Sequence, residues 1–105
     1  MAGSKGRGVR SGAPIDTCSA LAFRVVLNSP QAAVLAMLKR GDLLAVQLDP
    51  RVEGGVNAVL GDEPAGAITG ARKNSLVTCL RNGYTFEAEV IDLTGGLVQV
   101  DVRPA

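Results

Sequence analysis

Apolar and polar residues alternate most regularly near the C-terminus. In the first half of segment 84–93 (YTFEAEVIDL), even positions are apolar and odd positions polar, and in 97–102 (LVQVDV) valines occupy every second position. A period of two is typical of a strand with one buried face and one wet face. The intervening Thr94-Gly95-Gly96 suits a tight turn. We therefore predict an antiparallel hairpin.

Four further runs of apolar and β-branched residues are expected to form short strands. They cover residues 20–27, 43–48, 56–60 and 65–69. Each run is bounded by residues that favour turns or loops. In particular, Gly61-Asp62-Glu63-Pro64 is expected to form the turn between the third and fourth strands. Gly66, inside the fourth run, indicates a bulge or a close approach of another backbone segment.

Two helices are expected among these strands. Ser29 is a suitable N-cap and Pro30 suits the first helical position, so a helix is predicted from there to about Arg40. An apolar stripe with helical spacing supports this assignment. The second helix is predicted over 75–81, capped by Asn74 or Ser75 and stopped at Gly83.

The predicted order of elements is thus β-α-β-β-β-α-β-β in one α+β domain over residues 15–105. Six short strands would expose long edges unless the sheet were closed or covered. We therefore predict a small six-stranded, OB-like, partly closed β-barrel with two short helices. Residues 1–14 are rich in Gly and small polar residues, and are expected to form a disordered basic N-terminal tail.

Several kinds of chemistry lack the residues they need. The chain has no histidine, and its two cysteines form no CxxC pair, so neither a zinc site nor a histidine-activated nucleophile is expected. Alternating acids such as Glu87 and Glu89 are better explained as the wet face of a strand than as an acid–base pair. We expect a non-enzymatic protein without metal or cofactor.

The cysteines and the apolar runs also bear on location. Cys79 falls on the apolar side of the second predicted helix and is expected in the core. Two cysteines do not make a disulfide framework, which favours a reducing compartment. No apolar run approaches the roughly 20 residues that span a bilayer, and the N-terminus has no secretory pattern. We expect a soluble cytoplasmic protein with no membrane partner.

Positive charge gathers at a few places in a nearly balanced chain of 11 Lys and Arg against 10 Asp and Glu. Arg72 and Lys73 precede the second predicted helix, and Arg81 ends it. With Lys39-Arg40 they could form a basic rim for phosphates, whereas ordinary solvation of helix ends also explains Lys39-Arg40 and Arg81. Lys5, Arg7 and Arg10 of the tail could add phosphate contacts or could belong to a solvated extension.

Three segments resemble the HIRAN domain family. They are LKRGDLLAVQLDP (38–50), VNAVLGDEPAGAIT (56–69) and LVTCLRNGYTFEAEV (76–90), and the resemblance covers about residues 20–102. It implies a small OB-like barrel of six strands and two helices that binds DNA ends. The acidic-Asn-Pro-Asp stretch usual in that family is replaced here by Arg51-Val52-Glu53-Gly54-Gly55.

Two functions from different classes remain open at this point. The first is a non-catalytic module that binds single-stranded nucleic acid or DNA ends, with charge from Arg72, Lys73, Arg81 and the tail. Base stacking would need Tyr84 or Phe86, the only nearby aromatic residues, to be exposed. The second is a protein-interaction adaptor, or a small subunit of a complex, that pairs a strand edge with a partner protein.

Overall fold

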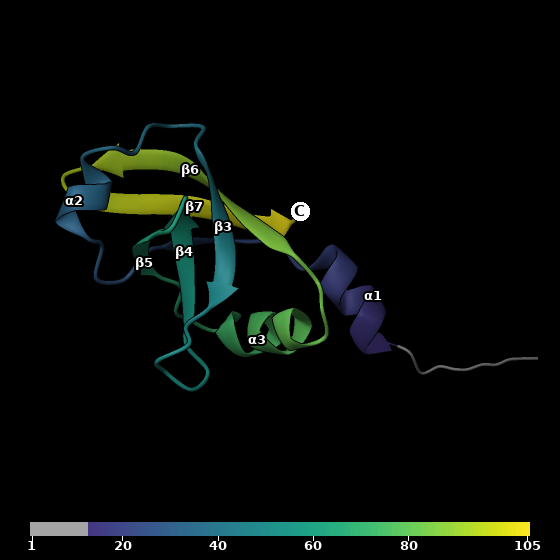
Figure 1. Ribbon diagram of the computed structural model, residues 1–105. Coiled ribbons are helices and arrows are strands. Elements are labelled where there is room, and N and C mark those ends of the chain that lie inside the picture. The colour runs from purple at the N-terminus through teal and green to yellow at the C-terminus, as the bar shows by residue number, and fades with distance from the viewer. Residues whose placement is uncertain (1–12) are drawn as a thin grey trace, which may run out of the picture.

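Six strands of the chain form one antiparallel sheet that curves into a partly closed barrel (Figure 1). The computed structural model describes residues 13–105. Along the chain the elements are α1 (Ala13–Ala20), β2 (Phe23–Val26), α2 (Ala32–Leu35), β3 (Leu43–Leu48), β4 (Val56–Leu60), β5 (Glu63–Ala67), α3 (Lys73–Arg81), β6 (Phe86–Thr94) and β7 (Leu97–Pro104).

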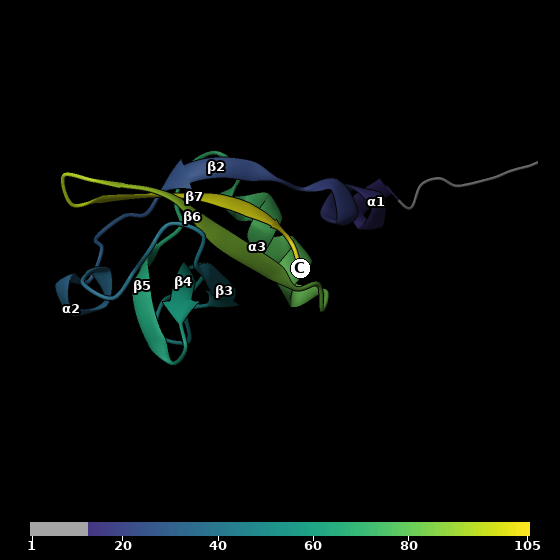
Figure 2. The same cartoon turned by 90° about the horizontal axis from the view of Figure 1, so that it is seen from above.

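The two ends of the sheet approach each other along one seam. The strand order is β2-β7-β6-β3-β4-β5, which leaves β2 and β5 as the edges. An isolated antiparallel bridge joins Asn28, just after β2, to Ala67 at the end of β5. Seen from above, the sheet wraps around, with β2 and β5 on opposite sides of the interior (Figure 2). The predicted six-stranded OB-like barrel is confirmed.

The β6–β7 hairpin is the longest pairing in the sheet, and it is confirmed as predicted. Its register runs from Phe86 opposite Pro104 to Thr94 opposite Leu97, with a shift between Val90 and Asp92. The alternation read from the sequence determines which side chains are buried. Every second residue of β7 points into the core, beginning at the fully buried Val98.

The core is almost entirely aliphatic, and no polar or charged residue in the described part of the chain is buried. The inner face of the sheet contributes valines, alanines and Leu44, while α3 adds Leu76 and Val77. In Figure 1, α3 lies below the sheet and α2 at its far left end, so the helices cover opposite ends of the barrel. None of the described helices is long and apolar enough to cross a membrane.

Strand β5 begins earlier than predicted. Glu63 and Pro64, expected in the preceding turn, already pair with Leu60 and Val59 of β4. The turn is therefore only Gly61-Asp62, and Gly61 has a φ of +63°, which glycine adopts at little cost. Pro64 fits here because β5 is an edge strand. On such a strand, a residue whose backbone faces away from the neighbouring strand needs no N–H group for sheet pairing.

The first predicted helix is mostly absent, and Ser29 does not cap it. Helix α2 spans only Ala32–Leu35, its N-cap is Gln31, and no side chain makes the capping hydrogen bond. Ser29 instead has a φ of +50°. After Leu35 the hydrogen bonds shorten to three residues, from the Met37 N–H to the Val34 carbonyl and from the Leu38 N–H to the Leu35 carbonyl. The Lys39 N–H then donates to the Asp42 carboxylate at 2.8 Å, so the helix does not resume.

A further helix, α1, lies where the sequence predicted the end of the tail and a turn into the first strand. Ala13 and Pro14, assigned to the tail, are its first residues. Its residues lack a clear apolar stripe of helical period, so periodicity gave no signal for it. Helix α1 packs against α3 and β7, outside the barrel (Figure 1).

Candidate functional site

The start of α3 presents the basic pair that the sequence singled out. Gly70, with a φ of +102°, turns the chain after β5, and the helix begins at Lys73 with Arg72 as its N-cap. Neither Asn74 nor Ser75 is the cap, contrary to prediction. The Arg72 carbonyl already accepts a hydrogen bond from the Leu76 N–H at 3.1 Å, which starts the helix two residues earlier.

Helix α3 packs against the core through its inner face, and its first turn faces outward. Leu76, Val77 and Cys79 are buried, whereas Arg72 is exposed and Lys73 half-buried. No side chain caps the free N–H groups of the first turn. Two cations and the positive end of the helix dipole therefore coincide at this position.

Arg72 and Lys73 differ from the other cations of residues 13–105 in making no ion pair. The six others all pair with acids. These pairs are Arg24 with Asp101, Lys39 with Asp42, Arg40 with Asp92, Arg51 with Asp49, Arg81 with Glu53, and Arg103 with Glu87 and Glu89. Within the described chain, the unpaired positive charge is thus concentrated on two adjacent residues.

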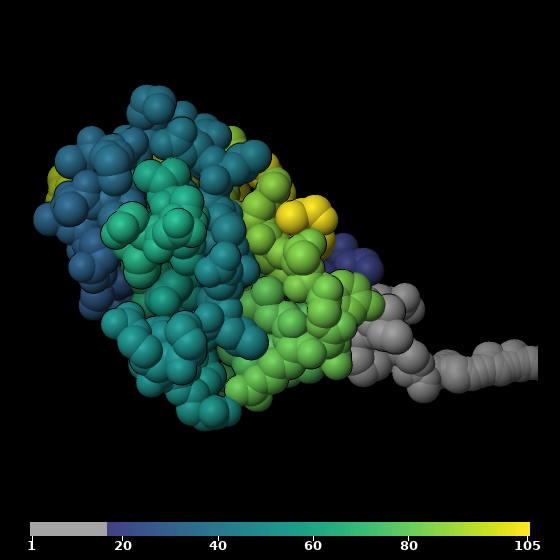
Figure 3. All heavy atoms as spheres, viewed as in Figure 1, coloured from purple at the N-terminus to yellow at the C-terminus, as the bar shows by residue number. Residues whose placement is uncertain are grey.

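Arg81 is not brought together with the basic pair. It lies at the opposite end of α3, about 12 Å from Lys73 along the helix axis at 1.5 Å per residue. Its guanidinium Nη2 is 2.7 Å from Glu53 Oε2, in the loop between β3 and β4. In the space-filling view this loop and α3 adjoin on the face that they share with β4 and β5 (Figure 3). Arg81 therefore ties the loop to the helix.

The aromatic side chains do not form an exposed stacking platform. Phe86 is buried at 4% exposure, and Tyr84 is half-buried and packs against the core. Phe23 is likewise half-buried against the core. These three are the only aromatic residues of the chain. Binding at the start of α3 would therefore depend on charge. The tail cations Lys5, Arg7 and Arg10 lie outside the described residues.

A polar groove that sequence reasoning missed crosses the outer side of β4 and β5. Two hollows of about 430 and 320 Å³ share Arg51, Asn57 and Pro64 in their walls. One continues to Asn28 and Gln31, near α2. No sequence pattern indicates this groove, because its walls come from four separate segments, and only their pairing across the seam places them together.

The charge of this groove does not favour an anion. Its cation, Arg51, lies 3.5 Å from Asp49, and Asp62 and Glu63 also line the hollows. The backbone N–H of Arg51 donates to the Asp49 carboxylate, and this bond lowers the pKa of Asp49, with smaller contributions from the Asn57 side chain and the Arg51 charge. Asp49 therefore remains ionised, and the groove is lined by amides and net negative charge.

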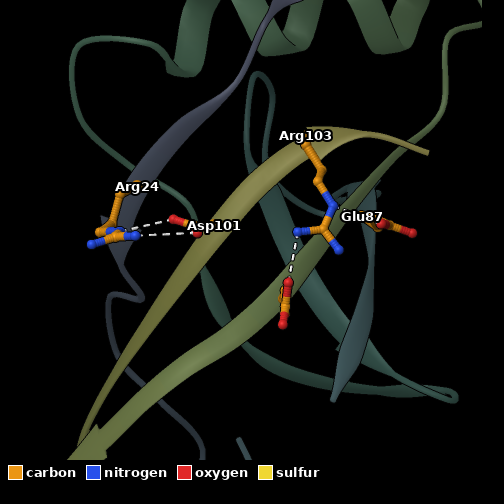
Figure 4. Close-up of polar contacts among 5 residues, drawn as sticks. Arg24, Glu87, Asp101 and Arg103 are labelled. Carbon is orange, nitrogen blue, oxygen red and sulfur yellow. Dashed lines mark hydrogen bonds and ion pairs between the residues drawn. The ribbon is translucent and has the colours of Figure 1, made fainter. Parts of the chain in front are cut away.

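Charged side chains also form a ladder on the outer face of β2, β7 and β6 (Figure 4). Arg24 Nε donates to Asp101 at 2.8 Å, and Arg103 donates to both Glu87 and Glu89, at 2.8 and 2.7 Å. The hydrogen bond from Arg24 lowers the pKa of Asp101. Each of the five side chains is engaged with another in one of two groups, Arg24 with Asp101 and Arg103 with Glu87 and Glu89, so these charges support the sheet.

The described residues contain no cluster of three or more His, Cys, Asp and Glu that could hold a metal ion. The two cysteines form a disulfide between α1 and α3, with 61 residues of sequence separation. Cys79 is buried, as expected, but it is bonded to Cys18, which the sequence argument did not foresee. The sequence argument favoured a reducing compartment because two cysteines do not make a disulfide framework, and the observed disulfide weakens that argument.

Comparisons with family models, with curated proteins and with solved structures gave no match.

Proposed function

We propose that this domain is a non-catalytic binding module for single-stranded nucleic acid or DNA ends, with Arg72 and Lys73 as its principal phosphate contacts. The observation that carries the proposal is the concentration of unpaired positive charge on these two residues. A cation already paired with a carboxylate must lose that partner before it binds phosphate. Arg72 and Lys73 are free of this cost.

The setting of the pair adds to its suitability for phosphate. Backbone N–H groups at a helix N-terminus and the helix dipole both favour an anion. The resemblance of residues 20–102 to the HIRAN family supports DNA ends as the form of nucleic acid. Lys5, Arg7 and Arg10 would extend the contacts along the strand, since this segment carries three cations and no acid. Arg81 and Tyr84 would contribute little, because one is paired and the other is packed.

The test is a fluorescence-anisotropy titration with single-stranded and duplex DNA at several salt concentrations. Affinity should fall steeply as salt rises, because each neutralised phosphate releases a counterion. Stronger binding to oligonucleotides with free ends than to closed circles of the same sequence would support end recognition. Absence of measurable binding at about 50 mM salt would reject this function.

The second candidate is a protein-interaction adaptor, and the free edge of β2 favours it. The Leu27 N–H donates to Val98 of β7, and the Asn28 N–H donates in the opposite direction, to Ala67. Because backbone groups alternate in direction along a strand, those of Arg24 and Val26 point away from β7. No described strand pairs with them. A partner strand could add there.

A double substitution, Arg72→Ala with Lys73→Ala, separates these two candidates. Removing Arg72 and Lys73 should weaken nucleic-acid binding and leave a partner on the β2 edge in place. Val26→Pro would do the reverse, because proline removes a backbone donor on the free edge.

We also propose a cytoplasmic location, which can be tested by the thiol state of Cys18 and Cys79 in cell extracts quenched with acid.

A further inference from the structure

The polar groove over β4 and β5 holds carboxylates that no cation of the domain neutralises. Among the Asp and Glu side chains of residues 17–105, only Asp62 and Glu63 form no ion pair. They are adjacent and exposed where β4 turns into β5. Asp62 lies in the wall of one hollow and Glu63 in the wall of the other. A cationic group that enters the groove therefore meets two carboxylates without a partner.

The one cation in the groove wall, Arg51, is already engaged. Its Nε lies 3.5 Å from Asp49 Oδ1, and its backbone N–H donates to the same oxygen at 2.9 Å. Arg51 and Asp49 thus balance each other, and the negative charge of Asp62 and Glu63 remains. An anionic ligand such as a phosphate chain would be repelled here.

The rest of the lining suits a peptide. Asn28 and Gln31 lie in the wall near α2, and Asn57 belongs to both hollows. A carboxamide can donate and accept hydrogen bonds, and so can each peptide group of a ligand. Leu48, which is 36% exposed, and Pro64 add apolar surface on which the methylene stem of a lysine or arginine can pack.

We propose that this groove binds an extended segment of a basic peptide, with Asp62 and Glu63 as the partners of its lysine or arginine side chains. The two hollows, of about 430 and 320 Å³, share part of their walls, so together they accommodate a chain better than a single small cation. In the space-filling view β5 lies toward the viewer, between the segment around α2 and the β3–β4 loop (Figure 3).

The carboxamides favour a peptide over a polyamine. A polyamine carries ammonium donors and no acceptor, whereas the carboxamide N–H groups of the groove need acceptors such as peptide carbonyls. The inference does not rest on the proposed function, because neither Arg72 nor Lys73 lines the groove.

The groove can be tested by fluorescence anisotropy, with the full chain and a fluorescein-labelled peptide of alternating Arg, Ser, Lys and Ser residues at about 50 mM salt. The double variant Asp62→Asn with Glu63→Gln keeps the side-chain shapes and removes both charges. It should weaken binding about threefold to thirtyfold, as the loss of two exposed ion pairs requires. The variant Arg72→Ala with Lys73→Ala should bind the peptide like the wild type.

A charge-matched control removes two acids that lie outside both hollows, Glu53→Gln with Asp92→Asn. It should change the affinity for the peptide by less than about twofold. In ¹H–¹⁵N spectra of the full chain, the shifts that the peptide causes should cluster in residues 28–31, 47–51 and 57–66.

Four results would overturn the proposal. The first is no binding of the basic peptide at the stated salt concentration. The second is equal weakening in the two acid variants, which would show attraction to the overall field of the domain. The third is equal binding of a peptide with Gln in place of every Arg and Lys, or displacement of the basic peptide by spermine at equal concentration. The fourth is a set of shift changes that lies outside the groove.

Discussion

Asn28 and Ala67 exchange two backbone hydrogen bonds, of 2.8 and 2.9 Å, and these bonds close the barrel seam. They join residues that are 39 positions apart in sequence. Just beside them, the Gln31 N–H donates to the Ala65 carbonyl at 2.9 Å. These hydrogen bonds join the segment after β2 to β5, so the sheet closes into a barrel instead of remaining open.

Gly66 should tolerate no side chain at this seam. A Cβ at this position would lie 3.0 Å from Leu27 Cβ and 3.2 Å from the Asn28 carbonyl oxygen. We expect Gly66→Ala to destabilise the domain by about 1–3 kcal/mol, the usual cost of overpacking. Urea denaturation measures this. Thr69→Ala, at an exposed position just beyond β5, is the control and should change stability by less than about 0.5 kcal/mol. Equal midpoints for the two variants would show that the seam can open.

The domain should become more stable when Ser29 is replaced by glycine. Its φ of +50° is in the left-handed region, which costs a residue with a Cβ about 1 kcal/mol. Ser29→Gly relieves that strain, although greater freedom of the unfolded chain offsets part of the gain. A small rise in the urea midpoint is expected. Ser29→Ala should be nearly neutral, because no cap hydrogen bond is lost. A marked loss of stability in Ser29→Ala would contradict this and show that the Ser29 hydroxyl caps the helix.

Acid should weaken the link between β2 and β7. The hydrogen bond from Arg24 lowers the pKa of Asp101, so the folded state favours the ionised carboxylate. This contribution is complete above the unfolded pKa, about 4, and is lost as pH falls through the lower folded pKa. Asp101→Asn should therefore flatten the fall in melting temperature below about pH 4. Asp62→Asn is a charge-matched control. Identical acid profiles for wild type and Asp101→Asn would refute the contribution of this pair.

Reduction of the disulfide should lower the global stability of the domain. In the chain-entropy model, a cross-link that spans 61 residues stabilises by about 4 kcal/mol at 25 °C. We expect the free energy of unfolding to fall by roughly 2–4 kcal/mol when dithiothreitol is added, since native strain commonly reduces the ideal value. Paired urea titrations measure it. An unchanged midpoint in fully reduced protein would mean that the bond constrains little of the unfolded chain.

The parts of the fold that the sequence predicted well are those with local signals. The β6–β7 hairpin follows from strict alternation around Gly95 and Gly96, and β3 and β4 begin and end where turn residues bound their apolar runs. Gly66 was expected to mark a bulge or a close approach. It does both, since it pairs with Ala58 next to a register shift and lies against Leu27.

The parts that escaped prediction depend on contacts between distant residues. Ser29 resembles a cap before Pro30, but the pairing of Asn28 with Ala67 sets the backbone there instead. The disulfide joins residues 61 positions apart, and two cysteines alone do not reveal that they meet. The same holds for the candidate site. Arg72 and Lys73 were visible in the sequence, but only the six ion pairs elsewhere distinguish them from the paired Arg81.

The central claim is that the unpaired cations at the start of α3 bind phosphate. Its most direct test compares two charge-matched double variants, Arg72→Ala with Lys73→Ala and Lys39→Ala with Arg40→Ala. The second pair has partners in Asp42 and Asp92. The measurement is the slope of log affinity against log salt for single-stranded DNA. The first variant should lose affinity and reduce the slope by about 1.4, as two lost phosphate contacts require, while the second stays near wild type. Equal losses in both variants, or no loss in the first, would contradict the account.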